Sequence, residues 1–166
     1  MTHALRPISH GPIPRALEKA EWYRLLNEPR LAESICHDVL AVEPEDQPAL
    51  IMLVLTLSDQ SRASASIAHT EARDAVSRLK GEYERIYYAD NVSERRAKAY
   101  LDAPTPSSAY AAYDYLEQAM EHYDRAQALE PPGVDDAVLR WNTCVRLIER
   151  HHLGPAPDDA GEQSLE

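Results

Sequence analysis

Four acidic side chains at helical spacing are the first candidates for binding chemistry in this chain. They are Asp114, Glu117, Glu121 and Asp124. Residues three or four positions apart share one face of a helix, so the four carboxylates form an acidic stripe. The stripe is most simply a solvated helix face, and the sharper alternative is recognition of a basic segment. A metal site is disfavoured because no Glu-x-x-His pair occurs there.

The cysteines and histidines are not spaced for catalysis. Cys36 and His37 are neighbours on one expected helix, where adjacent side chains point about 100° apart, so they do not make a nucleophile–base pair. Cys36 and Cys144 lack CxxC spacing and lie in apolar settings, which predicts two reduced core thiols rather than a disulfide or a metal site. The remaining candidates are interpreted as ordinary surface histidines: His3, His10, His151 and His152.

Enzyme signatures do not occur in the sequence. It contains no Gly-rich phosphate loop, no HExxH and no GxSxG. We therefore predict a protein that is not an enzyme and that needs no cofactor or metal. A carboxylate-based enzyme or a metal-binding helical domain remains the third alternative.

The net charge of −11 is distributed unevenly along the chain. Between residues 102 and 136, eight acids and one base give a local charge of −7. Nucleic acids are disfavoured as partners because phosphate binding needs clusters of Lys and Arg, whereas a basic partner is favoured electrostatically. No secretory signal and no run of about 18 apolar residues is found, so we expect a cytoplasmic protein without a membrane span.

Proline clusters divide the chain into long runs that favour helix. The runs are rich in Ala, Leu, Glu and Arg, which predicts an all-α protein of about seven helices. The expected helices are 14–26, 29–42, 47–59, 71–80, 81–101, 107–130 and 135–151, with a loop at 58–70. Their expected N-caps are Asn27, Asp46, Ser107 and Asp135. Residues 1–13 are expected to form a flexible arm, 14–152 one helical domain, and 153–166 a disordered acidic tail.

Residues 13–44 resemble a tetratricopeptide repeat. Two short helices, a tight link and a proline stop fit within this stretch, as in one such repeat. The family's small, aromatic, small and proline positions are filled by Ala20, Tyr23, Ala32 and Pro44. Cys36 and Val39 depart from the pattern, because the family usually has an aromatic residue and an alanine there.

A second match to the same family occurs late in the chain. It comprises Ala119, Tyr123, Ala126 and Pro131, at the spacing of the family's second helix and terminal proline. Between the two matches the register is lost, with an apparent insertion before the fifth expected helix. The resemblance implies an α-α superhelix, a solenoid of three irregular repeats and a capping helix.

The resemblance also implies a binding groove. In this family the first helix of each repeat lines a concave groove that takes a peptide, and the corresponding positions here are Leu17, Glu21, Arg24, Ile51, Leu55, Ile86 and Asp90. The alternative is that the long fifth and sixth helices fill this groove. The implied function is a non-catalytic scaffold or adaptor for a protein or peptide, and the runner-up is a small acidic chaperone for a basic or aggregation-prone client. Neither the partner nor the oligomeric state follows from the residues.

Tyrosine is unusually common, with nine tyrosines, two tryptophans and no phenylalanine. A tyrosine ring adds apolar area and a hydroxyl that needs water or a partner, so the rings suit either a core with hydroxyls at its rim or a contact surface. Those on the fifth and sixth expected helices are Tyr83, Tyr87, Tyr88, Tyr100, Tyr110, Tyr113 and Tyr115.

Overall fold

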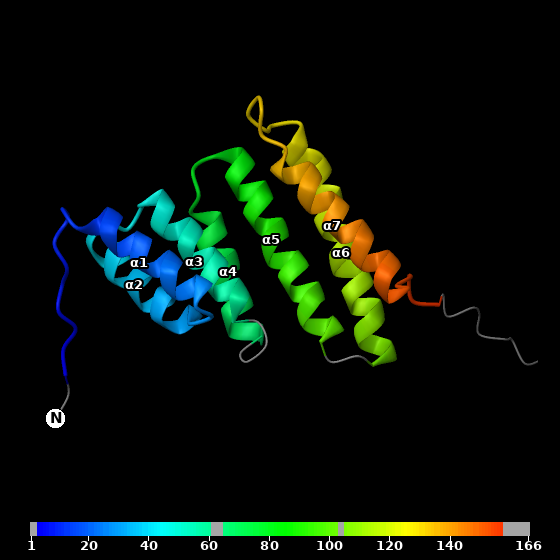
Figure 1. Cartoon of the computed structure of the whole chain (residues 1–166), viewed down its shortest axis with the longest axis horizontal. Helices are drawn as coiled ribbons and strands as arrows, with labels where there is room; N and C mark the ends of the chain where they lie inside the picture. Colours follow the sequence, from blue (N-terminus) through cyan, green and yellow to red (C-terminus); the bar gives the residue numbers. More distant parts are fainter. Residues whose placement is uncertain (1–2, 61–64, 103–104, 158–166) are drawn as a thin grey trace, which may run out of the picture.

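Seven α-helices pack side by side in chain order (Figure 1). The structure is a computed structural model that describes residues 3–60, 65–102 and 105–157. The helices are α1 (Ile13–Leu25), α2 (Pro29–Val42), α3 (Gln47–Asp59), α4 (Ala65–Ser77), α5 (Glu82–Leu101), α6 (Pro106–Gln127) and α7 (Asp136–His151). No strand occurs within these ranges, so the predicted all-α class with about seven helices is confirmed.

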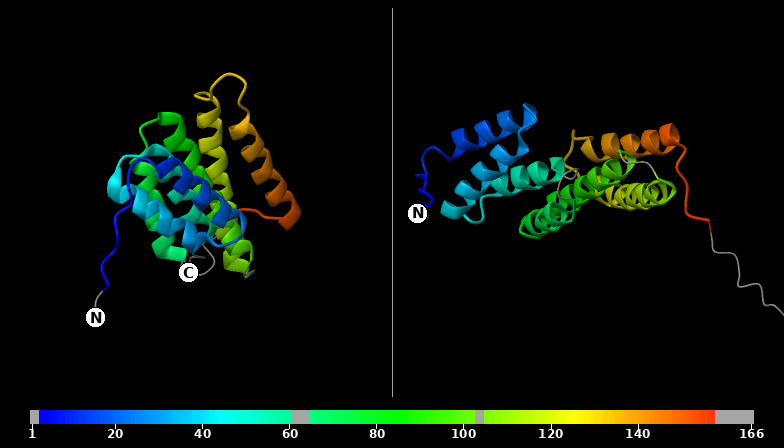
Figure 2. Two further views of the ribbon diagram at one scale, coloured as in Figure 1. Left: turned by 60° about the vertical axis from the view of Figure 1, so that its left-hand side comes forward. Right: turned by 90° about the horizontal axis from the view of Figure 1, so that it is seen from below.

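Each helix packs against the next one, and alternate helices also meet in the first half of the chain. α1 contacts α3, and α3 contacts α5. In the right-hand view of Figure 2, α1 and α7 lie on the upper side of the stack, whereas α2 and α6 lie on the lower side. Because α3 contacts both α1 and α5, these three helices adjoin one another.

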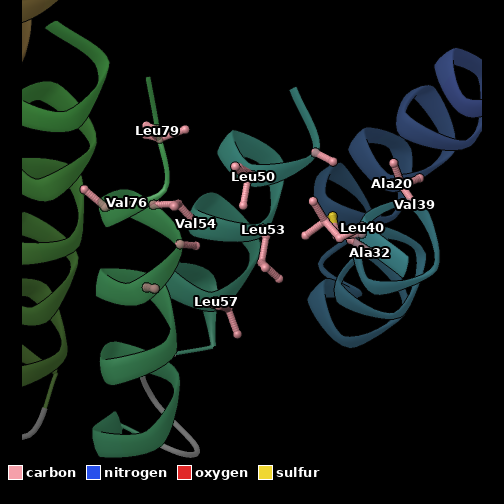
Figure 3. Close-up of a cluster of buried hydrophobic side chains, with 14 of the residues drawn as sticks. Ala20, Ala32, Val39, Leu40, Leu50, Leu53, Val54, Leu57, Val76 and Leu79 are labelled. Carbon is pink, nitrogen blue, oxygen red and sulfur yellow. The ribbon is translucent and has the colours of Figure 1, made fainter. Parts of the chain in front are cut away.

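The first hydrophobic core lies between α1 and α5 and is centred on α3 (Figure 3). The sequence of α3 is apolar nearly all round, and Leu50 and Val54 are indeed completely buried in this core. Ala20 of α1 and Ala32 of α2 are also completely buried. Because alanine is small, these two positions allow α1 and α2 to approach closely.

Enlarging one of these alanines should strain the core. We expect Ala20→Leu to lower the free energy of unfolding by about 1–3 kcal/mol, because the added atoms have no space to occupy. Urea denaturation followed by circular dichroism measures this change. Lys19→Leu, which adds the same side chain at an exposed position of α1, should stay within about 0.5 kcal/mol of wild type. An Ala20→Leu variant that is as stable as Lys19→Leu would contradict the close packing of α1 on α2.

One helix starts earlier than the sequence predicted. α4 begins at Ala65 rather than at residue 71, so the end of the expected loop 58–70 is helical. The small side chains Ala68 and Ala72 are both buried and pack this helix against the first core. Alanine has the highest helix propensity, and tertiary packing here outweighs the neighbouring Ser and Thr residues. The rest of the expected loop, residues 61–64, lies outside the described residues.

Helix capping agrees with the prediction at one terminus and differs at the others. The Asp46 carboxylate accepts a hydrogen bond from the Ala49 backbone N–H at 2.7 Å and caps α3 as predicted. Ser107 was predicted to cap α6, but the cap is Thr105, which exchanges hydrogen bonds with Ser108 in a capping box. Asp135 precedes α7 without a side-chain cap bond.

The predicted cap at Asn27 is wrong. Residue Glu28 precedes α2, and its side chain makes no cap hydrogen bond. Asn27 instead adopts a left-handed backbone conformation with φ of 60° directly after α1. Asparagine tolerates this conformation better than most residues, so Asn27 serves the turn between the two helices rather than the start of α2.

The chain segments outside the helical stack are described only in part. Ile8 packs against the first core, and Nδ1 of His10 lies 2.9 Å from Oε1 of Glu43 at the end of α2. Most of the expected acidic tail, residues 158–166, lies outside the described part of the chain. Among the described helices, none combines the length and the apolar character needed to cross a membrane.

Candidate functional site

Two ion pairs connect α1, α3 and α5 on one side of the stack. Asp59 at the end of α3 lies between two arginines. Its Oδ2 accepts from Nε of Arg24 on α1 at 2.6 Å, and its Oδ1 lies 3.1 Å from a terminal nitrogen of Arg95 on α5. All three side chains are partly exposed, with 21%, 20% and 35% accessibility for Arg24, Asp59 and Arg95. The ion pairs therefore fix α1, α3 and α5 relative to one another at the protein surface.

Helical spacing places apolar side chains next to these ion pairs. Ile51, Leu55 and Asp59 follow one another at intervals of four and so form one row along α3. Ile51 and Leu55 are half-buried, which leaves part of each side chain at the surface. We name this surface the α1–α3–α5 face and define it by Leu17, Glu21 and Arg24 of α1, Ile51, Leu55 and Asp59 of α3, and Tyr88 and Arg95 of α5.

The predicted groove residues of α1 and α3 lie on this face. Leu17, Glu21 and Arg24 are spaced by four and three positions and so lie in one row along α1. Leu17 is half-buried and Glu21 is exposed. Arg24 is engaged with Asp59, which the sequence analysis did not include. Five of the seven predicted groove positions are thus brought together on one side of the protein.

The two groove residues predicted on α5 are wrong. Ile86 packs against the second hydrophobic core, which α5, α6 and α7 form, and Asp90 is completely buried against α6. The positions of α5 that turn toward α1 and α3 are Tyr88, which packs against the first core, and Arg95, which pairs with Asp59. The register carried over from the first repeat fails because the chain between α3 and α5 does not keep the family spacing.

The long helices α5 and α6 do not bury this face. α6 packs on α5 and α7, on the far side of α5 from α1 and α3 (Figure 1). A cavity of about 590 Å³ lies between α2, α3 and α4 instead, with Leu53 and Leu57 in its lining. The α1–α3–α5 face is therefore a surface of partly exposed side chains rather than a closed pocket.

A second polar cluster is buried between α5, α6 and α7. Its centre is the Glu94 carboxylate, which is completely buried. Glu94 lies 2.5 Å from Nζ of Lys98 and 2.8 Å from a terminal nitrogen of Arg140, and it accepts from the Tyr123 hydroxyl at 3.2 Å. Arg140 also donates to Oδ1 of Asn91 at 2.9 Å, so α5 and α7 are tied together through one guanidinium.

The electrostatics of this cluster keep its donors in their donating forms. Burial, and after it the proximity of Glu94, raise the pKa of Tyr123, so the hydroxyl stays protonated and donates to Glu94. Burial alone would lower the pKa of Arg140, but Glu94 and Tyr123 outweigh it and raise that pKa. Glu94 and Tyr123 are buried, and the partly exposed Lys98 and Arg140 close the cluster, so it forms a structural network that ties α5 to α6 and α7.

A third polar contact joins α5 to α6. Oδ1 of Asp90 lies 2.6 Å from Nδ1 of His122. Burial raises the pKa of Asp90 to about 8, and only Arg125 opposes this shift. Burial also lowers the pKa of His122, with Arg125 and Arg73 acting in the same direction. Both shifts favour the neutral forms, so the two groups share one proton as a hydrogen bond rather than forming an ion pair.

The acidic stripe lies on the outer side of α6. Asp114, Glu121 and Asp124 are exposed and Glu117 is partly exposed. Among the described residues, no group of three or more His, Cys, Asp or Glu side chains is arranged to hold a metal. The geometry thus leaves the stripe available to solvent or to a basic segment.

The tyrosines and cysteines have mainly structural surroundings. Tyr87 stacks on Tyr83 at 5.5 Å and meets the buried Tyr123 edge-on at 6.0 Å, within the second core. Cys36 and Cys144 are free thiols in the two cores. Burial raises the pKa of each thiol to about 12, so both stay protonated and unreactive.

Comparison of the chain with protein-family models, with curated proteins and with solved structures gave no match. The fold and the α1–α3–α5 face therefore define a class only: an all-α stack of helix pairs with a mixed polar and apolar surface on its odd-numbered helices. The sequence signal for Asp59 was present in its spacing from Ile51 and Leu55. Arg95 gave no such signal, because its partner lies on another helix.

Proposed function

We propose that the protein is a non-catalytic, cytosolic scaffold that binds a peptide or protein partner on the α1–α3–α5 face, in the manner of a tetratricopeptide-like domain. The observation that carries this proposal is the pairing of Asp59 with both Arg24 and Arg95. The pairing holds three helices in one surface and leaves Ile51 and Leu55 partly exposed within it. A preorganised surface loses less entropy when it binds, which favours recognition.

Apolar contacts should provide most of the affinity on this face. Each large side chain that becomes buried contributes on the order of 1.5–3 kcal/mol before the costs of association. The arginines and Asp59 offer hydrogen-bond donors and an acceptor at the edge of the apolar row. Partly exposed charges of this kind fix the register of a partner more than they add affinity.

The proposal predicts that a charge in the apolar row abolishes partner capture. Tagged wild-type protein and the Leu55→Glu variant are used to capture partners from lysate of the native source, and the bound proteins are quantified by mass spectrometry. We expect a partner retained by the wild type to be reduced at least about tenfold by Leu55→Glu, which corresponds to about 1.4 kcal/mol.

Ile67→Glu is the matched control. Ile67 is 67% exposed on α4, away from the face, so the variant makes the same change of charge and polarity elsewhere. It should retain the partner. Equal loss in both variants would mean that the added negative charge acts non-specifically, and an unaffected Leu55→Glu variant would contradict the proposed face.

A small acidic chaperone is the second candidate function, favoured by the exposed carboxylates of the acidic stripe on α6. Such a client would be held by charge. It should dissociate at about 0.5 M salt, where the screening length falls to about 4–5 Å. A partner bound through Ile51 and Leu55 should remain bound under the same conditions.

A further inference from the structure

A small cavity of about 250 Å³ lies between α4, α5 and α6, away from the α1–α3–α5 face. Val76 and Val92 contribute to its apolar lining, while Arg73, Gln118 and His122 bring hydrogen-bonding groups to it. Arg73 and Gln118 make no hydrogen bond or ion pair with any other described residue. Both side chains are exposed, so the cavity has solvent-accessible donors at its edge.

His122 is held in place from behind by a buried acid. Asp90 is completely buried, and its Oδ1 engages Nδ1 of His122 at 2.6 Å. The other ring nitrogen, Nε2, is therefore the polar atom that the imidazole can present to the cavity. Oδ2 of Asp90 has no hydrogen-bond partner among the described side chains and backbone groups. A buried oxygen without a partner is costly for folding, and few such groups occur in native proteins.

The surroundings of the cavity are locally positive in a chain of net charge −11. Burial and the two guanidinium groups of Arg125 and Arg73 lower the pKa of His122, and Glu121 opposes them only in part. An anion placed next to these groups would be attracted by both arginines. It would also stabilise a proton on the imidazole.

The shared proton sets the hydrogen-bonding direction of the ring. Because the pKa of Asp90 is raised to about 8, its carboxyl group retains a proton at neutral pH and donates it to Nδ1 of His122. Nδ1 then accepts, so Nε2 carries the other ring proton and is a donor. Above about pH 8 the Asp90 proton is lost, Nδ1–H donates to Asp90, and Nε2 becomes an acceptor.

We propose that this cavity binds a small oxyanion, a phosphate or a carboxylate group, between the Arg73 guanidinium and Nε2–H of His122. The size of the cavity, the unpartnered Arg73 and the His122 ring fixed by buried Asp90 carry the proposal together. Gln118 supplies a further donor from α6. The lining of this cavity shares α5 with the α1–α3–α5 face but has no residue in common with it.

The test is an NMR titration of the histidine ring signals with inorganic phosphate, and separately with acetate, at constant ionic strength and neutral pH. The His122 signal is assigned by its absence in His122→Asn, a variant whose amide oxygen can accept a hydrogen bond from the Asp90 carboxyl group. We expect a saturable shift of the His122 signal with a dissociation constant in the millimolar range. The tighter of the two anions identifies the group that the site prefers.

Matched variants separate this site from general charge attraction. Arg73→Ala should weaken binding at least about tenfold. Arg78→Ala removes the same charge just beyond the end of α4, where Arg78 lies in the lining of the larger cavity, and it should leave binding unchanged. Equal weakening by Arg73→Ala and Arg78→Ala, or the absence of a saturable His122 shift with either anion, would overturn the proposal.

Sulfate provides the pH test, because its own charge is constant over the range used. Its affinity should fall as the pH rises from about 7 to about 9, since Nε2 changes from donor to acceptor as Asp90 loses its proton. Asp90→Asn should remove this pH dependence, because its amide cannot ionise. A sulfate affinity that is the same at both pH values in the wild type would contradict the assigned role of His122.

Discussion

Replacing Glu94 with alanine is expected to lower the free energy of unfolding by about 3–5 kcal/mol. The variant removes the common acceptor of Lys98, Arg140 and Tyr123 inside the second core. The buried Tyr123 hydroxyl and the guanidinium of Arg140, which is only 25% accessible, then lose this partner. A largely buried charge without compensation is far more costly than the loss of a surface ion pair. Urea denaturation at neutral pH, followed by circular dichroism, measures the difference.

Glu117→Ala serves as the control for this experiment. Glu117 is a partly exposed acid on α6, so its loss should change the free energy of unfolding by less than about 0.5 kcal/mol. A Glu94→Ala variant with a similarly small effect would show that the network does not hold α5, α6 and α7 together.

The stability of the protein should fall as the pH rises through neutrality, and Asp90 should be the cause. The pKa of Asp90 is raised from 3.8 to about 8 in the folded protein, because burial disfavours the charged carboxylate. The folded state then keeps a proton that the unfolded state releases. The contribution of the protonated Asp90 to the free energy of unfolding is fully present below about pH 4 and is lost as the pH approaches 8.

The size of this effect follows from the linkage between proton binding and folding. For each pH unit over which only the folded state keeps the proton, the free energy of unfolding falls by about 1.4 kcal/mol. We therefore expect the wild type to lose about 2 kcal/mol between pH 6.5 and 8.5 relative to Asp90→Asn. The lowered pKa of His122 acts in the opposite direction, but only at more acidic pH, so this interval isolates Asp90. Parallel pH profiles for the two proteins would contradict the assignment.

The helical fold could be predicted because its signals are local. Proline borders and apolar runs fixed the extents of α2 and α3, and Asp46 was recognised as a cap from its place before an apolar run. α4 was predicted too short because Ser and Thr surround its buried alanines. Thr105 was missed because the capping residue depends on the backbone geometry. Thr105, Ser107 and Ser108 all carry a hydroxyl group, so the sequence offered more than one candidate cap for α6.

The candidate site could be predicted only where helical spacing determines it. Leu17, Ile51 and Leu55 were implied by the resemblance to the tetratricopeptide repeat, whose register holds along α1 and α3. Asp90 was misplaced because the register carried over from the first repeat does not hold at α5, and its hydrogen-bond partner in the buried position, His122, is 32 positions away. Glu94 was missed because two of its partners, Tyr123 and Arg140, belong to other helices and no local pattern connects them to it.

The most direct test of the proposed function is to purify the captured partner and measure its affinity for the wild type and for two variants, Leu55→Glu and Glu121→Lys. Calorimetry gives this affinity at about 0.15 and about 0.5 M salt. Partner binding on the α1–α3–α5 face predicts that Leu55→Glu weakens the affinity at least about tenfold at both salt concentrations, and that Glu121→Lys has no such effect. The opposite result, in which Glu121→Lys abolishes binding and Leu55→Glu matches the wild type, would contradict the account and place the partner on the acidic stripe of α6.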